Sequence, residues 1–103
     1  MSDERNYYVY IMASHKNGAL YSGMTNDLIR RVQEHKAKRN PKSHTSKYNI
    51  TRLVYFEIFN SAEDAIYREK FVKKLTRARR VKLIETDNPE WAELHKGDET
   101  VPW

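Results

Sequence analysis

The chain has 103 residues and a formal net charge of +5, from 19 lysines and arginines against 14 aspartates and glutamates. This length fits a single domain, and the absence of cysteine excludes disulfides and thiolate-bound zinc. No apolar stretch approaches the length of a bilayer-spanning helix, and the N-terminus has no signal-peptide pattern. We therefore expect a soluble cytoplasmic protein, with one domain over residues 1–95 and a flexible tail over residues 96–103.

The basic charge suits a partner with a phosphate backbone. The sequence pI is about 9.5, and many of the positive charges cluster in residues 36–47 and 70–82. Such a footprint is typical of small nucleic-acid-binding domains. A basic solvated surface with no such partner would give the same net charge, so charge favours nucleic acid only modestly.

The first segments predict a β-hairpin. Residues 6–13 are rich in aromatic and β-branched side chains, which favours a strand. Asn17 and Gly18 form a strong hairpin turn signal, and residues 19–23 are expected to return as the second strand.

The predicted turn also sets a register. With a two-residue turn at 17 and 18, Tyr21 would lie opposite Ser14. Because side chains alternate along a strand, Tyr21 would share a sheet face with Met12 and Tyr10.

A basic helix is predicted next, from about Asp27 to about Lys38. Thr25 or Asn26 can cap its N-terminus. The following residues, 39–51, contain proline and several serines, threonines and asparagines, and are predicted to form a loop.

The second half predicts one strand and two helices. Residues 52–59 ("RLVYFEIF") are apolar enough for a central strand. Ser61 and Asp64 resemble a capping box for a helix that ends at about Leu75. A third helix is expected over residues 78–86.

Asn88 and Pro89 would end the third helix, and residues 89–94 are predicted to add a short helical turn. The order β-β-α-β-α-α predicts an α+β domain, with a small antiparallel sheet packed against helices.

Glu69 is the most informative residue of the second helix. It falls within the predicted apolar stripe of that helix, which comprises Ala62, Ala65, Ile66 and Val72. A buried carboxylate is costly unless it is paired or binds a metal. An edge position paired with a nearby lysine or arginine explains the pattern equally well.

Four other residues have side chains suited to phosphate chemistry. Arg31 can clamp a phosphate in bidentate fashion, and His35, one helical turn later on the same face, can accept a proton. Tyr10 and Tyr21 can orient or deprotonate water if cations lower their pKa. Taken singly, each of the four also fits an ordinary surface or sheet position.

Taken together, these residues resemble a known family. The triplet "YVY" at 8–10, ten intervening residues and "YSG" at 21–23 resemble the paired motif that names the GIY-YIG nuclease superfamily. The segment "TNDLIRRVQEH" is similar to the helix that carries the family's active-site arginine, which corresponds to Arg31, and His35 matches a histidine found in several branches. The segment "DAIYREKFVKK" resembles the helix with the metal-binding glutamate, which corresponds to Glu69.

The resemblance extends from residue 6 to about residue 94 and is closest to the small stand-alone branch of the superfamily. The segment "LIETDNPEW" places the family's later asparagine at Asn88. Tyr8 stands where the family has its first glycine, and Ser22 where it has the isoleucine of the second motif. Both motif tyrosines and Gly23 are kept.

This resemblance implies a three-stranded antiparallel sheet flanked by helices, and metal-dependent hydrolysis of DNA. In that scheme Glu69 binds one Mg²⁺ or Mn²⁺ ion. Tyr10 or Tyr21 orients or deprotonates the attacking water. Arg31 stabilises charge that develops on the phosphate, and His35 assists proton transfer or binds phosphate.

Further contacts to the substrate are expected from Gly23, Asn88, Lys73, Arg79 and Arg80. The expected partner is DNA, with RNA not excluded, no membrane, and a protein partner or a second copy of the chain to supply target choice. Structure-selective cleavage in DNA repair or recombination would fit a chain without an extra targeting domain. Two alternatives stay open: a nucleic-acid-binding module without catalysis, and a protein-interaction domain of the same fold.

Overall fold

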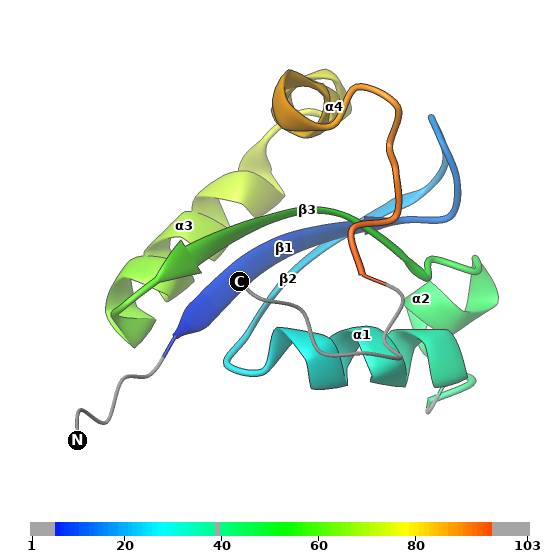
Figure 1. The fold of residues 1–103 in the computed structure, drawn as a ribbon, viewed down its shortest axis with the longest axis horizontal. Helices are drawn as coiled ribbons and strands as arrows, with labels where there is room; N and C mark the ends of the chain where they lie inside the picture. The colour runs from blue at the N-terminus through cyan, green and yellow to red at the C-terminus, as the bar shows by residue number, and fades with distance from the viewer. Residues whose placement is uncertain (1–5, 39, 96–103) are drawn as a thin grey trace.

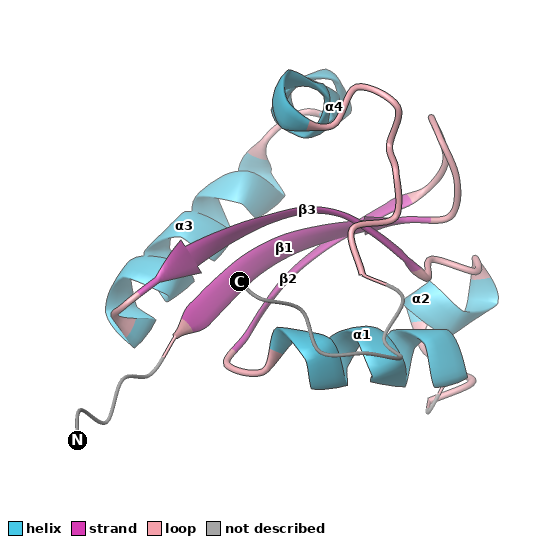
Figure 2. Ribbon diagram, viewed as in Figure 1, coloured by secondary structure: helices cyan, strands magenta, loops and turns pink. Residues whose placement is uncertain are grey.

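The computed structural model describes residues 6–38 and 40–95 (Figure 1). The elements in chain order are β1 (Tyr7–Ala13), β2 (Leu20–Thr25), α1 (Leu28–Ala37), α2 (His44–Lys47), β3 (Arg52–Phe59), α3 (Ala62–Lys74) and α4 (Arg77–Asp87). The strands form one antiparallel sheet in the order β2-β1-β3, with helices on both sides (Figure 2). The predicted α+β architecture and the order of its long elements are confirmed. The predicted tail, 96–103, lies outside the described residues.

Two apolar cores lie on the two faces of the sheet. Alternate side chains of β1 point to opposite faces, so this central strand contributes to both cores. One core joins β1 to α3, α4 and the segment after α4, through Val9, Ile11, Ala13, Val54, Tyr55, Ala65, Val72, Ile84 and Trp91. The other joins β1 to α1 and the segment before β3, through Tyr10, Met12, Leu28, Val32, Ile50 and Leu53.

The register of the hairpin differs from the prediction. Tyr21 lies opposite Met12, not opposite Ser14, and Tyr10 lies opposite Gly23. The error is a shift of two residues, which preserves the face of every side chain. Tyr10 and Tyr21 therefore do share one face, as predicted, with ring centroids 6.2 Å apart.

The turn explains the shift. The Gly18 N–H donates to the His15 carbonyl over 2.9 Å, and the Ser14 N–H donates to the Ala19 carbonyl over 3.0 Å. The loop is thus longer than the predicted two-residue turn. Asn17 has a φ of 63° within it, a left-handed conformation that asparagine tolerates better than most residues.

The N-cap of α1 is Asp27, and the prediction of Thr25 or Asn26 is wrong. The Asp27 carboxylate accepts the Arg30 N–H over 3.2 Å. Thr25 supports the cap from outside the helix, because its Oγ1 accepts the Asp27 N–H over 3.0 Å. The helix ends at Ala37, and its C-cap, Lys38, has a left-handed φ of 51°.

The predicted loop at 39–51 contains a short helix, α2. Ser43 caps it by accepting the Ser46 N–H over 3.2 Å. A helix of four residues has no repeating apolar pattern, so the periodicity on which helix prediction depends is absent. Two of its side chains, Thr45 and Ser46, are nevertheless buried.

Helix α3 begins after its predicted cap residue, Ser61, but Ile66 of the predicted apolar stripe is not buried. Ser61 accepts the Asp64 N–H over 3.3 Å. Ala65 and Val72 are fully buried, whereas Ile66 is 41% exposed. The face that packs on the sheet is therefore narrower than the run of apolar residues.

Beyond α4, residues 89–94 form a turn and an extended segment, and the helical turn predicted there is wrong. This segment returns to the sheet, because the Leu94 N–H donates to the Leu53 carbonyl over 2.8 Å. Across the described residues, no helix has both the length and the apolar character needed to cross a membrane.

Candidate active site

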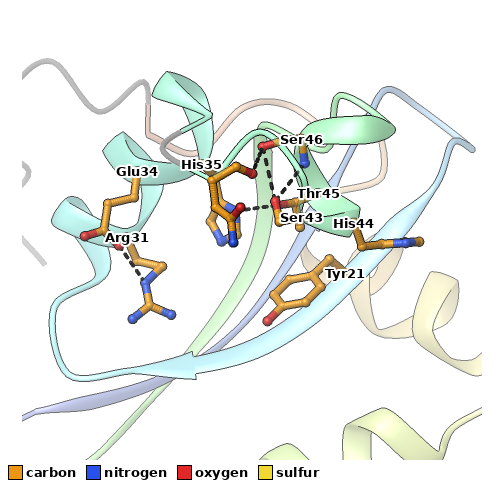
Figure 3. A pocket seen from close by; sticks show the side chains of 9 residues that line it. Tyr21, Arg31, Glu34, His35, Ser43, His44, Thr45 and Ser46 are labelled. Carbon is orange, nitrogen blue, oxygen red and sulfur yellow. Dashed lines mark hydrogen bonds and ion pairs between the residues drawn. The ribbon is translucent and has the colours of Figure 1, made fainter.

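A pocket of about 470 Å³ lies between β2, α1 and α2 (Figure 3). One wall carries Tyr21 from β2 and Arg31, Glu34 and His35 from α1. The opposite wall is formed by α2 and the residues before it: Asn40, Ser43, His44, Thr45 and Ser46. The pocket therefore combines a phenol, a guanidinium and imidazole groups in one small space.

The amphipathic pattern of α1 directs Arg31 and His35 to the pocket. Leu28 and Val32 are buried in the core beneath the helix. Arg31 and His35, one turn apart, lie beside that buried stripe and are partly buried. The prediction that these two residues are neighbours on one face is confirmed, since both line the pocket with Tyr21.

Tyr10 lies behind the pocket wall and is fully buried. Its hydroxyl extends over Gly23, the residue opposite it on β2. A Cβ at Gly23 would lie 2.7 Å from the Tyr10 hydroxyl oxygen and 2.9 Å from Cε2 of Tyr21. The glycine thus leaves the space in which both tyrosine rings sit.

The Tyr10 hydroxyl is held by Arg31 and His35. His35 Nε2 lies 3.3 Å from the hydroxyl oxygen, and the Arg31 guanidinium donates a hydrogen bond to it. Burial raises the pKa of Tyr10 well above its ordinary value, with a further contribution from Tyr21, and the hydrogen bond from Arg31 only partly opposes this rise. Tyr10 is therefore a neutral phenol at neutral pH.

Arg31 is anchored on two sides. Its Nε donates to Glu34 over 3.0 Å. Burial lowers the pKa of Arg31, but the bonds and charges of Tyr10 and Glu34 outweigh burial, and the net shift is upward. The guanidinium is thus permanently charged and held at the pocket wall, as a phosphate-binding arginine must be.

His35 joins α1 to α2. Its Nδ1 lies 3.2 Å from Thr45 Oγ1, and its ring centroid is 5.6 Å from that of Tyr21. Burial lowers the pKa of His35, the charge of Arg31 lowers it further, and Glu34 opposes the change. The imidazole is therefore mainly neutral at neutral pH, the form that can accept a proton.

Glu69 lies on α3 and is not part of the pocket wall. Its side chain is 20% exposed and forms an ion pair with Lys73 over 3.2 Å. It is close enough to Tyr10 for its charge to contribute to the raised pKa of that hydroxyl. Glu69 is thus a partly buried carboxylate paired with lysine, which is one of the two possibilities that the sequence left open.

These properties also fit a divalent ion at Glu69. An exposed lysine is a weakly held partner, which an ion can replace at the carboxylate. Within residues 6–38 and 40–95, no group of three or more histidine, aspartate or glutamate side chains could hold a metal. An ion held at Glu69 would take water and substrate phosphate as further ligands, as magnesium often does.

The other predicted contact residues lie elsewhere. The side chain of Asn88 is buried, donates to the carbonyls of Val54 and Ala92 over 3.0 and 2.9 Å, and accepts the Ala92 N–H over 2.9 Å. Its amide therefore joins β3 to the segment after α4, and substrate has little access to it. Arg79 and Arg80 belong to α4, whose apolar residues pack in the core on the sheet face away from the pocket.

The sequence reasoning missed the second wall of the pocket. Thr45, Ser43 and His44 lie in a segment that was predicted to be a loop, and no motif marked them as functional. The cluster of hydroxyl residues "SHTS" at 43–46 is the one local signal. Its significance depends on a contact between residues 35 and 45 that only the folded chain shows.

Comparison with known proteins gives a consistent result. Residues 6–82 match the family model described as the GIY-YIG catalytic domain. A UPF0213 protein of Clostridium perfringens is 40% identical over 77 residues, which cover 75% of this chain and 81% of the relative. A UPF0213 protein of Haloquadratum walsbyi is 38% identical over 79 residues, covering 77% of this chain and 86% of the relative.

A solved structure is similar over almost its whole length. The solution NMR structure of a UPF0213 protein from Bacillus halodurans matches with a TM-score of 0.53 and 32% sequence identity. The match covers 92% of this chain and 99% of that one. The fold and the sequence motifs therefore indicate the same family.

Proposed function

Because the chain belongs to the GIY-YIG catalytic-domain family, we propose that it is a metal-dependent endonuclease that hydrolyses phosphodiester bonds in DNA. The observation that carries the proposal is the pocket formed by Tyr21, Arg31 and His35, with Tyr10 directly behind it. A charged, anchored arginine, a neutral histidine and a phenol in one space are the groups that phosphate hydrolysis needs. The net charge of +5 supports a polyanionic substrate.

The proposal gives the two tyrosines different roles. Tyr21 lines the pocket and is placed to contact an attacking water, which it orients. Tyr10 is buried and enters the reaction as a neutral phenol. Its hydroxyl positions Arg31 and His35 through hydrogen bonds.

In the proposed reaction Arg31 stabilises negative charge on the phosphate, and His35 accepts a proton. Arg31 binds the scissile phosphate and stabilises the negative charge that grows on it. His35 Nε2 is the final acceptor of the proton that the attacking water loses as its oxygen bonds to phosphorus. Because the Tyr10 hydroxyl points at Nε2, Tyr10 passes its own proton to His35 and takes up the proton from water, so the phenol stays neutral and the imidazolium forms at His35. Glu34 holds Arg31 in place and partly compensates the positive charge beside the histidine.

Glu69 is the residue proposed to hold the divalent ion, Mg²⁺ or Mn²⁺. A bound ion would supply charge neutralisation at the phosphate and stabilise the leaving oxygen. Lys73 balances the charge of Glu69 in the free protein and is released for contact with a phosphate when the carboxylate is otherwise occupied. Structure-selective cutting in DNA repair or recombination is the finer hypothesis for its biological role.

The test is cleavage of labelled flap, fork, nicked, duplex and single-stranded DNA in Mg²⁺, Mn²⁺ or EDTA. Parent protein, Glu69→Gln and the matched control Glu63→Gln, an exposed glutamate at the start of the same helix, are purified in parallel. We expect metal-dependent cleavage by parent and Glu63→Gln, and none by Glu69→Gln, which should still bind DNA.

Cleavage of equal rate by Glu69→Gln would contradict the proposal and indicate a contaminating nuclease. If all three proteins bind DNA in a salt-dependent manner and none cleaves it, the chain is a nucleic-acid-binding module. Absent or salt-insensitive binding would favour the protein-interaction domain.

A further inference from the structure

A series of hydrogen bonds runs from α2 to the pocket, and its direction can be deduced from one end. The Ser46 hydroxyl lies 2.8 Å from the Asn40 carbonyl. A carbonyl can only accept, and a serine hydroxyl has one proton. Ser46 therefore donates to Asn40 and must accept at its own oxygen from Ser43, which lies 3.1 Å away.

The same rule fixes the next two bonds. Because Ser43 gives its one proton to Ser46, its oxygen must accept from Thr45 Oγ1 over 3.2 Å. Thr45 then has no proton left for His35, so Thr45 Oγ1 accepts from His35 Nδ1, 3.2 Å away. Ser43 Oγ also accepts the Ser46 N–H, which uses both of its acceptor positions.

The other end of the series is compatible with this direction. Arg31 can only donate, and it donates to the Tyr10 hydroxyl oxygen. The Tyr10 proton is then free to point at His35 Nε2 over 3.3 Å. A neutral histidine with its proton on Nδ1 has a bare Nε2 that can accept this bond, so the direction set by the hydroxyls of α2 also satisfies the contact with Tyr10.

We propose that the hydroxyls of Thr45, Ser43 and Ser46 fix neutral His35 in the Nδ1–H tautomer, with Nε2 bare and turned toward Tyr10. These three are positioning residues: they act through His35 and do not touch substrate. The opposite tautomer would leave no proton between Thr45 and Ser43 and would lose one bond of the series. The catalytic benefit rests on the proposed function, whereas the tautomer itself does not.

For the proposed reaction, the Nδ1–H tautomer makes Nε2 of His35 the proton acceptor. Only the bare Nε2 faces the tyrosine side of the pocket, so the proton released by water has one destination on the ring. Nδ1–H, held by Thr45, keeps the ring orientation fixed while the imidazolium forms. The wrong tautomer of a catalytic histidine can cost up to about 10⁴-fold in rate, as in serine proteases.

The test combines NMR and kinetics on four full-length proteins: parent, Thr45→Val, Thr45→Ser and the control Thr86→Val. Valine has nearly the shape of threonine without the hydroxyl. Thr86 is exposed and its hydroxyl bonds only within α4, to the Lys82 carbonyl. The His35 tautomer is read from ring ¹⁵N shifts and ¹H–¹⁵N couplings at about pH 7.5, above the ordinary pKa of histidine.

We expect the parent, Thr45→Ser and Thr86→Val to show the Nδ1–H tautomer, and Thr45→Val to lose this preference. In cleavage assays Thr45→Val should lose at least about tenfold in kcat with little change in KM, and Thr45→Ser should recover most of it. Heteronuclear spectra identify a variant that fails to fold, and Ser46→Ala then serves as the second variant, with a partial loss of the same preference.

An Nε2–H tautomer in the parent would overturn the inference, and so would an unchanged Nδ1–H tautomer in Thr45→Val. The NMR result does not depend on nuclease activity. If the protein cleaves no DNA but the tautomer responds as expected, the proposed function fails and the hydrogen-bond direction stands.

Discussion

Gly23 offers the sharpest test of how closely the sheet fits the two tyrosines. Replacing it with alanine adds one methyl group on the face that carries Tyr10 and Tyr21. That carbon would lie 2.8 Å from Tyr10 Cζ and 2.9 Å from Tyr21 Cε2. Carbon atoms pack best at about 3.5–4.0 Å, so the methyl group overlaps each ring by roughly 0.6 Å or more.

The neighbours have little freedom to relieve this overlap. Tyr10 is fully buried, and its hydroxyl is bonded to Arg31 and His35. Overpacking of a core by one methyl group typically costs about 1–3 kcal/mol in the free energy of unfolding. A displacement of reacting groups by about 1 Å can cost on the order of 100-fold in rate, so we expect a loss of cleavage rate as well as of stability.

The assay pairs urea unfolding with single-turnover cleavage. Ser22→Ala is the matched control, because Ser22 is the adjacent buried residue on the opposite face of β2. Its hydroxyl has no hydrogen-bond partner among the described residues, so its removal should leave stability unchanged or slightly raised. A Gly23→Ala protein with parent-like stability and cleavage rate would refute the reasoning about the tyrosine pair.

Three further predictions concern pH, packing and DNA contact. Burial and Arg31 lower the pKa of His35 from its ordinary value of 6.5, and the neutral ring is the active form. We therefore expect kcat/KM to fall on the acid side, as the pH decreases through a value below 6.5. His35→Gln should lack this acid-side fall. Asn88→Ala should lower the free energy of unfolding by about 1–3 kcal/mol, because it leaves buried backbone groups of Val54 and Ala92 unpaired. The folded fraction of this variant should keep the KM of the parent. A raised KM in a variant as stable as the parent would instead make Asn88 a substrate contact. Replacing Arg79 and Arg80 with glutamine should weaken DNA binding and reduce its salt dependence. The single-turnover cleavage rate of the saturated protein–DNA complex should not change. A large loss of that rate would place α4 at the active site.

Local patterns in the sequence predicted much of this fold. Alternation along β1 and β2 placed Tyr10 and Tyr21 on one face, and that result survived an error in register because a two-residue shift does not change the face. The four-residue spacing of Arg31 and His35 likewise predicted their common position on α1. Both inferences depend only on the geometry of a single element.

The parts that failed depend on contacts between distant segments. The exposure of Ile66 reflects how α3 lies on the sheet, which its own periodicity does not determine. The role of Thr45 depends on its contact with His35, and the role of Asn88 on its contact with Val54. For these residues the local sequence supplies the chemical group, and tertiary packing decides what it meets.

The most direct test of the central claim compares two adjacent arginines of α1. Arg30 and Arg31 both pair with Glu34, over 3.3 and 3.0 Å, but only Arg31 lines the pocket with Tyr21 and His35. Single-turnover cleavage in Mg²⁺ would be measured for Arg31→Ala and Arg30→Ala under saturating protein. We predict a loss of at least about 100-fold for Arg31→Ala, in line with the removal of one preorganised charge-stabilising donor, and a rate within about threefold of the parent for Arg30→Ala. Equal rates for the two variants would contradict the claim that this pocket is the active site.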